Sequence, residues 1–264
     1  MMKQRSKLLT LAFLMIQASH AASFPSTDEY LAASKKFDQQ RIEANARQTM
    51  PRMTDEKVAV VLEVLSDDRV LTERRFTVQD IGILLDVCGK ANEVNMSYAL
   101  FDLKNQVTEK TDVAVATLQL QKLMAKNIYS FQDEVARVQP FLIRCMSVQL
   151  PLMTKFLESL RPEEFTDIRR DGALQVRNGT LNMYYGALVS VSDRRIKEGN
   201  RLRTLAALAD TSSVFAESLP SDRRKLIADL ANSASQSAPD ALRKHLLTIQ
   251  KSMSNSTCSA ICKL

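Results

Sequence analysis

Apolar residues recur at helical spacing along most of the chain. Two runs with the spacing i, i+3, i+4 and i+7 are Val58, Val61, Leu62 and Leu65, and Ile81, Leu84, Leu85 and Cys88. Alternation with a period of two, which is typical of a half-buried strand, dominates nowhere. We therefore expect an all-α fold, a multi-helix bundle of about nine or ten helices without significant sheet. Because the connections look short, neighbouring helices should be mostly antiparallel.

Capping signals predict where several helices begin. Ser26 followed by Glu29 three residues later has the pattern of a capping box, in which side chain and backbone satisfy each other. Thr77 and Asp80 have the same spacing. Pro162 is followed by two acids, which suits the positive end of a helix dipole.

Other signals predict where helices break. Residues 89–92 contain glycine and asparagine, and we expect a break there. Pro140 and Pro151 each lack a backbone donor, so they should kink or interrupt the apolar stretch that contains them. Between these breaks a long helix is predicted from about Thr111. Its apolar stripe would be Leu120, Met124, Ile128, Phe131, Val135 and Val138.

The first 21 residues have the pattern of a secretory signal peptide. Lys3, Arg5 and Lys7 precede the apolar run 8–16, and small residues follow, which predicts cleavage near Ala21. The run is shorter than the ~20 residues that span a bilayer. We expect a protein that is periplasmic or secreted and not transmembrane after cleavage. The mature chain would be one helical domain, 22–252, followed by a Ser/Cys-rich tail, 253–264. The domain could be divided into two layers, 22–160 and 161–252.

Removal of this segment changes the charge of the protein. The formal net charge is +6, and the segment carries three positive charges and no acid, so the mature charge is 6 − 3 = +3. The remaining arginine pairs are interspersed with acids. Nucleic-acid binding needs a concentrated basic surface, so we expect no nucleic-acid partner.

All four cysteines lie in the exported part, where oxidising conditions favour disulfides. Four cysteines allow three pairings. Cys88 and Cys145 both lie in apolar helical contexts, and Cys258 and Cys262 lie close together in the tail, so we favour these two bonds. The competing pairings would tie the tail to the body, for example Cys145 with Cys262. The spacing suits neither a redox-active Cys-x-x-Cys motif nor a zinc site.

Half of the six glycines are spaced by seven residues, at Gly172, Gly179 and Gly186, in a segment with helical periodicity. Seven residues drift by only about 20° on a helix, so the three share one face. Each costs roughly 1 kcal/mol relative to Ala. We favour close packing against another helix as the compensation. A groove for a ligand or partner, with Arg170 and Arg177 as polar groups, and a non-helical segment are the alternatives.

Most catalytic constellations are missing. The mature chain has one histidine, His245, and no serine-hydrolase, nucleotide-binding or metalloprotease motif. Carboxylate chemistry is the exception, because Glu163, Glu164 and Asp167 cluster. These acids also suit the start of a helix. We expect no cofactor, no metal and no catalytic residue.

These absences favour an exported, non-catalytic protein that binds a macromolecular partner. The partner would be a protein, as for an inhibitor, an immunity factor or an envelope accessory protein; its identity and the oligomeric state are not indicated by the sequence. One alternative is a carrier that holds a small amphipathic ligand between helices lined by some of the 11 methionines. Another is a carboxylate-based hydrolase of cell-wall glycans.

Overall fold

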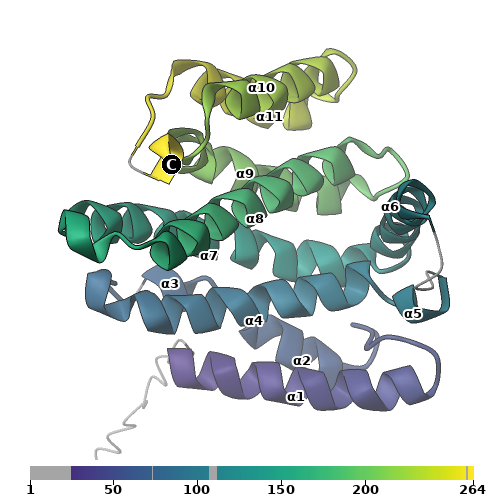
Figure 1. Cartoon of the computed structure of the whole chain (residues 1–264). Coiled ribbons are helices and arrows are strands. Elements are labelled where there is room, and N and C mark those ends of the chain that lie inside the picture. The colour runs from purple at the N-terminus through teal and green to yellow at the C-terminus, as the bar shows by residue number, and fades with distance from the viewer. Residues whose placement is uncertain (1–24, 73, 107–111, 260) are drawn as a thin grey trace, which may run out of the picture.

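The computed structural model describes residues 25–72, 74–106, 112–259 and 261–264. The predicted signal peptide and its cleavage point at Ala21 lie outside these residues. Within them every regular element is helical, and the arrangement is a multi-helix bundle (Figure 1). The all-α prediction is confirmed.

Nine of the helices have nine residues or more. They are α1 (Thr27–Ala46), α2 (Glu56–Val64), α4 (Ile81–Ala99), α6 (Val113–Ser130), α7 (Gln132–Ser159), α8 (Asp167–Ser192), α9 (Glu198–Ser218), α10 (Ser221–Gln236) and α11 (Asp240–Asn255). The short helices are α3 (Arg69–Thr72), α5 (Leu103–Gln106) and the 3-10 turns η1 (Val78–Asp80), η2 (Pro162–Glu164) and η3 (Ile261–Lys263). Short turns join α8 to α9 and α10 to α11, and each of these pairs packs together.

Both predicted capping boxes are present. The Ser26 hydroxyl accepts a hydrogen bond from the Glu29 backbone N–H at 3.2 Å, and the Glu29 carboxylate accepts one from the Ser26 N–H at 2.6 Å. The Asp80 carboxylate accepts from the Thr77 N–H at 2.8 Å. Each pair satisfies two donors that the first turn leaves without a helical partner.

Two predicted interruptions are wrong. Residues 89–92 lie inside α4, which is continuous from Ile81 to Ala99. Pro140 and Pro151 both lie inside α7, which is continuous over 28 residues, so a break is wrong here and a kink stays a prediction. The reason is tertiary packing: 15 residues of α7 are buried, Pro140 among them, and such packing outweighs the backbone hydrogen bond that each proline removes.

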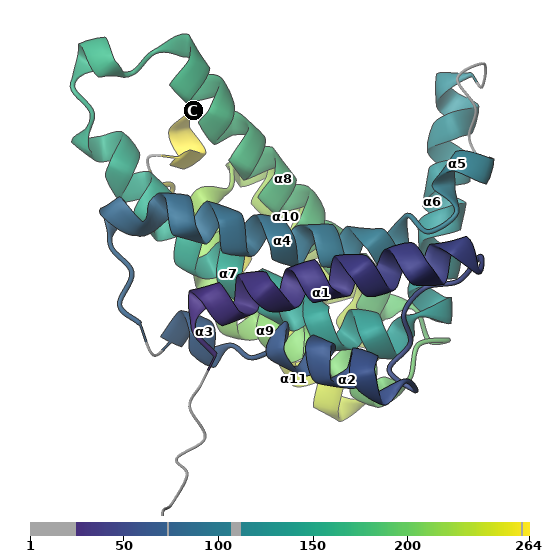
Figure 2. The same ribbon diagram turned by 90° about the horizontal axis from the view of Figure 1, so that it is seen from below.

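The predicted long helix from Thr111 is two helices. Phe131 separates α6 from α7 and has φ −113° and ψ 29°, outside the helical region. Its buried ring lies 5.6 Å from that of Tyr98 and 5.7 Å from that of Phe101, centroid to centroid. These aromatic contacts hold the chain at the break, and α6 and α7 leave it in different directions (Figure 2).

The buried side chains form two clusters that meet on α7. One cluster joins α7 to α1, α2 and α4, and includes Tyr30 stacked on Phe141 at 4.7 Å. The other joins α7 to α8, α9, α10 and α11, and includes Tyr184 and Phe215 at 4.6 Å. The central helix α7 therefore supports both halves of the bundle. The predicted division at residue 160 stays a prediction, since α7 contributes to both clusters.

None of the described helices is both long enough and apolar enough to cross a bilayer.

Candidate functional site

The cysteines pair as the sequence favoured. Cys88 and Cys145 are buried and join α4 to α7, with an S–S distance of 2.05 Å. Cys258 and Cys262 form the second disulfide. None of the four is a free thiol, so the pairing of Cys145 with Cys262 does not occur.

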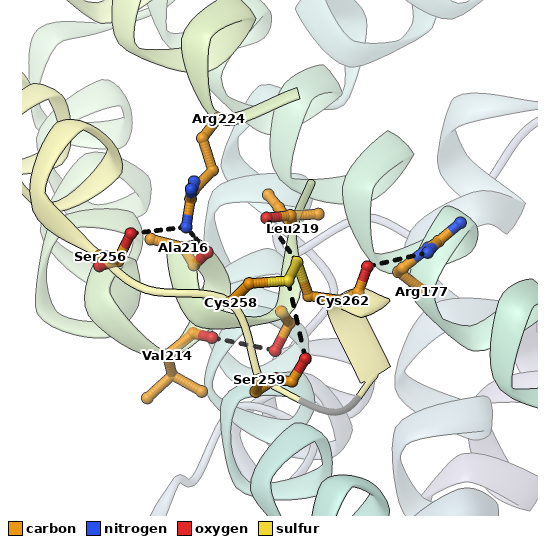
Figure 3. The surroundings of a disulfide bond; sticks show 10 residues. Arg177, Val214, Ala216, Leu219, Arg224, Ser256, Cys258, Ser259 and Cys262 are labelled. Carbon is orange, nitrogen blue, oxygen red and sulfur yellow. Dashed lines mark hydrogen bonds between the residues drawn. A yellow bond between two sulfur atoms is a disulfide. The ribbon is translucent and has the colours of Figure 1, made fainter. Parts of the chain in front are cut away.

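The tail is held against the body on several sides (Figure 3). The Ser259 N–H donates to the Glu217 carbonyl oxygen at 2.8 Å, and Arg224 Nη1 donates to the Ser256 carbonyl oxygen at 2.6 Å. Arg177 Nη1 donates to the Cys262 carbonyl oxygen at 3.4 Å. Ile261 is fully buried. The second disulfide therefore lies within a docked segment, not a loose one.

The glycine face of α8 requires a correction. Gly172, Gly179 and Gly186 lie on one helix, as their spacing predicted, but all three are exposed. No atom outside the local helix lies within 4 Å of where a Cβ would sit on any of them. Close packing against another helix of this chain is therefore wrong, and so is the non-helical alternative. A spacing of seven residues shows that the glycines share a face but not which way the face points.

The two arginines beside the glycines do not form a groove with them. Arg170 pairs with Asp167 of its own helix at 3.1 Å. Arg177 turns toward the tail and lines a cavity of about 340 Å³ between α8 and the start of α10. Arg223 lines the same cavity, but its guanidinium pairs with Asp222 at 3.3 Å. Both guanidiniums of this cavity are therefore already engaged.

The candidate carboxylates lie in ion pairs on the surface. Arg161 pairs with Glu163 and Glu164, each at 3.2 Å. The hydrogen bonds from Arg161 hold the pKa of the Glu164 carboxyl below its usual range. A general acid needs a raised pKa. Glu164 therefore lacks the environment that glycoside hydrolysis requires of its general acid.

Other catalytic or metal-binding groups are not assembled in the described ranges. No group of three or more His, Cys, Asp or Glu side chains there could hold a metal ion. His245 is half-buried on α11. No hydrogen bond joins its ring to another residue of the described chain, so it has neither a nucleophile nor an orienting acid.

Several exposed large apolar side chains lie close together in sequence at the start of α6. The exposed fractions are 80% for Val113, 49% for Val115 and 51% for Leu118. None of the ten residues 113–122 is buried, and none between Val113 and Gln121 is charged. We call residues 113–122 the α6 arm. Figure 2 shows the beginning of α6 standing away from the centre of the bundle, beside α5.

Only the second half of α6 is anchored. Leu123 and Asn127 are its two buried residues. The Asn127 side-chain amide donates to the carbonyl oxygens of Ala99 at 3.1 Å and Phe101 at 2.8 Å, which ties α6 to the end of α4. At the other end the Asp112 carboxylate accepts from the Ala114 N–H at 2.9 Å and caps the helix. The arm is thus a capped helical segment held at its base.

Val115 and Leu118 are three positions apart, so they are neighbours on one face of α6. At about 100° per residue, Leu118 lies on the side opposite Leu123 and Asn127, and Val115 lies between that side and the anchor. Sequence reasoning missed this surface, because it assigned the apolar stripe of the helix to Leu120, Met124 and Ile128 and gave Val115 and Leu118 no role. The signal that was present is the run of nine uncharged residues, 113–121.

Comparison of the chain with models of protein families, with curated proteins and with solved structures finds no match.

Proposed function

We propose that this is an exported, non-catalytic helical protein that binds a partner protein through the α6 arm. The observation that carries the proposal is that none of ten successive helical residues is buried and that they are apolar or uncharged up to Lys122, with Val113, Val115 and Leu118 exposed. Exposed apolar patches of this kind mark interaction surfaces. Inhibitors, immunity factors and envelope accessory proteins are classes that work by such binding.

The shape of the arm suits a groove on the partner. A helix that presents apolar residues three and four positions apart can be laid into an apolar groove of another protein. Full burial of a Val or Leu side chain stabilises by about 1.5–3 kcal/mol. Val115 and Leu118, which share a face, would supply the main apolar contacts with the partner. A phosphate backbone would find no cation on the first nine residues of the arm, so nucleic acid is disfavoured.

Two observations support an exported location. Both disulfides belong to the mature chain, and disulfides persist mainly in oxidising compartments. The pattern of residues 1–21 supports the same location from the sequence. We therefore propose a periplasmic or secreted protein, released by cleavage near Ala21.

The test compares two double variants with the same added charge. Val115→Glu with Leu118→Glu places two acids on the outer face of the arm, and Thr117→Glu with Gln121→Glu places two acids on its exposed flank. The mature chain carrying a tag is purified from the envelope of its native cells, and the affinity for the captured protein is then measured with purified components. We expect the first variant to weaken binding at least about a hundredfold, and the second to change it little.

Because none of the four positions is buried, both variants should melt at the temperature of the parent. Matched melting temperatures then show that the fold is intact. Equal binding by the parent and by the Val115→Glu, Leu118→Glu variant would contradict the proposal. So would equal losses in the two variants, because the loss would then follow charge and not the apolar face.

A further inference from the structure

We infer that a second site, separate from the α6 arm, binds a small amphipathic carboxylate. The site is a cavity of about 220 Å³ where four helix ends meet. Its lining includes Arg194, Arg201, Leu205, Ala234, Leu242 and Leu246. This inference does not depend on partner binding by α6.

Two turns of the bundle create the cavity. The turn from α8 to α9 and the turn from α10 to α11 lie on the same side of the molecule (Figure 1). Arg194 Nη2 donates to the Ser237 carbonyl oxygen at 3.4 Å and so connects the two turns. Because the lining comes from four helices, the cavity depends on how the α10–α11 pair is seated on the rest of the bundle.

The floor of the cavity is apolar. Leu205, Leu242 and Leu246 are buried members of the C-terminal core cluster. Their side chains form a fixed surface, since core residues are closely packed. A short hydrocarbon or aromatic group placed on this floor would lose contact with water, and that burial is favourable.

The polar part of the lining is positively charged. Arg194 and Arg201 line the cavity, and no Asp or Glu is among the lining residues. Arg201 Nε donates to the Val191 carbonyl oxygen at 2.6 Å, which fixes its guanidinium at the end of α8. Among the described residues, the two terminal nitrogens of Arg201 form no hydrogen bond or ion pair. The charge of Arg201 contributes to lowering the pKa of the Asp193 carboxyl, but that carboxylate forms its ion pair with Arg195, at 2.7 Å.

Guanidinium donors beside an apolar floor suit a ligand that has an anionic group and an apolar body. A guanidinium presents a planar fork that suits a carboxylate, and the apolar floor suits the body of the same ligand. The volume corresponds to about seven water molecules of liquid. Hexanoate is of this size, whereas a lipid acyl chain is too long to be enclosed. No methionine lines the cavity, in contrast to the predicted methionine-lined carrier.

The test is a titration of the ¹⁵N-labelled mature protein with sodium hexanoate, followed by NMR. We expect saturable shifts confined to 191–205 and 230–246. Hexan-1-ol should bind at least about tenfold more weakly, because it lacks the charge that the guanidiniums recognise. Hexyl phosphate distinguishes a carboxylate site from a general anion site: binding tenfold tighter than that of hexanoate would overturn the assignment to carboxylates.

Variants test the roles of charge and space separately. Arg201→Gln keeps a side-chain amide near Val191 but removes the charge, and should weaken hexanoate binding about tenfold or more. Arg203→Gln removes the same charge from an exposed residue of α9 that does not line the cavity, and should bind as the parent does. Ala234→Leu should block the cavity and abolish the saturable shifts.

Three results would overturn the inference. They are shifts that spread over the molecule without saturation, equal weakening by Arg201→Gln and Arg203→Gln, and unchanged binding in Ala234→Leu. Spectra of the unliganded variants that match the parent show that each is folded. Loss of partner binding in the α6 variants leaves these outcomes unaffected, because the two sites share no residue.

Discussion

The helices α6 and α7 are adjacent in the chain, yet they relate to the bundle in opposite ways. In α7, 15 of 28 residues are buried, and in α6 two of 18 are. The contrast does not follow from polarity. The buried part of α7 includes Glu134, whose carboxylate accepts a hydrogen bond from the Met53 N–H at 2.9 Å, whereas the exposed α6 arm is uncharged up to Lys122.

This difference shows what each helix contributes. Helix α7 lies between the two core clusters, so even a charged residue such as Glu134 is buried there, where its carboxylate also pairs with Arg52 at 3.3 Å. The α6 arm lies outside both clusters and exposes apolar residues that the fold does not need. Exposed apolar surface that does not serve the fold is available for binding.

The largest effect is expected from removing the disulfide of α7. The Cys88–Cys145 bond closes 57 residues of sequence separation, and the Cys258–Cys262 bond closes four. In the chain-entropy model these loops correspond to about 4 and about 2 kcal/mol of stability. We expect Cys88→Ala with Cys145→Ala to lower the free energy of unfolding about twice as much as Cys258→Ala with Cys262→Ala. Urea denaturation measures both, and a larger loss from the tail variant would contradict this ranking.

A leucine truncation in each helix compares their packing directly. Leu142 of α7 is fully buried, so Leu142→Ala should destabilise the protein by roughly 3 kcal/mol through lost contacts and a cavity. Leu118 of the α6 arm is about half exposed, so Leu118→Ala should change stability by no more than about 0.5 kcal/mol. Thermal and urea unfolding of both variants give the values. Similar losses at the two positions would show that the arm is packed after all.

The glycine face of α8 offers a gain of stability. An alanine Cβ at Gly179 would meet no atom within 4 Å beyond the local helix. Gly179→Ala should therefore raise the free energy of unfolding by about 1 kcal/mol, because alanine loses less conformational freedom in a helix. Unfolding of the isolated protein tests this. A destabilised variant would mean that the face is covered, as the sequence interpretation supposed.

The smallest effect concerns Asp133, which ties the start of α7 to the α8–α9 turn. Lys197 and Asn200 donate hydrogen bonds to its carboxylate at 2.6 and 2.7 Å, and they hold its pKa below the ordinary range. A lowered pKa stabilises the fold above the unfolded value of about 4, and that stability is lost as the pH falls through the folded-state pKa. The pair is partly exposed, so the effect should be under about 1 kcal/mol.

Asp133→Asn should accordingly reduce the decrease in the free energy of unfolding between about pH 5 and about pH 3. Lys197→Gln removes the main partner of the Asp133 carboxylate and should reduce that decrease similarly. Urea unfolding at both pH values measures this, and an unchanged slope in both variants would contradict the assigned role.

Much of the fold could be predicted from local patterns, because those patterns have local causes. A capping box such as Ser26 with Glu29 acts within one turn, so the sequence shows it directly. The break at Phe131 could not be predicted, since the apolar spacing continues from Ile128 to Val135 across it. That break depends on contacts with Tyr98 and Phe101, which are distant in sequence.

The candidate sites were less predictable than the fold. Apolar residues at helical spacing look alike whether the chain itself covers them or not, so Val115 and Leu118 could not be told from core residues. The same ambiguity placed the glycines of α8 inside, although they face outward. The cavity beside Arg201 needs side chains from four helices, and no local pattern reports their meeting.

Amide hydrogen exchange in α6 and α7 measures how firmly each helix is held in the fold. In the isolated mature protein, amides 116–122 should exchange by local opening far faster than amides 141–150 of α7, because few buried contacts hold the arm. On addition of the partner protein, protection should rise in the arm and stay constant in α7. Equal protection of the two segments in the isolated monomer, or a partner that leaves the arm unprotected, would contradict the account.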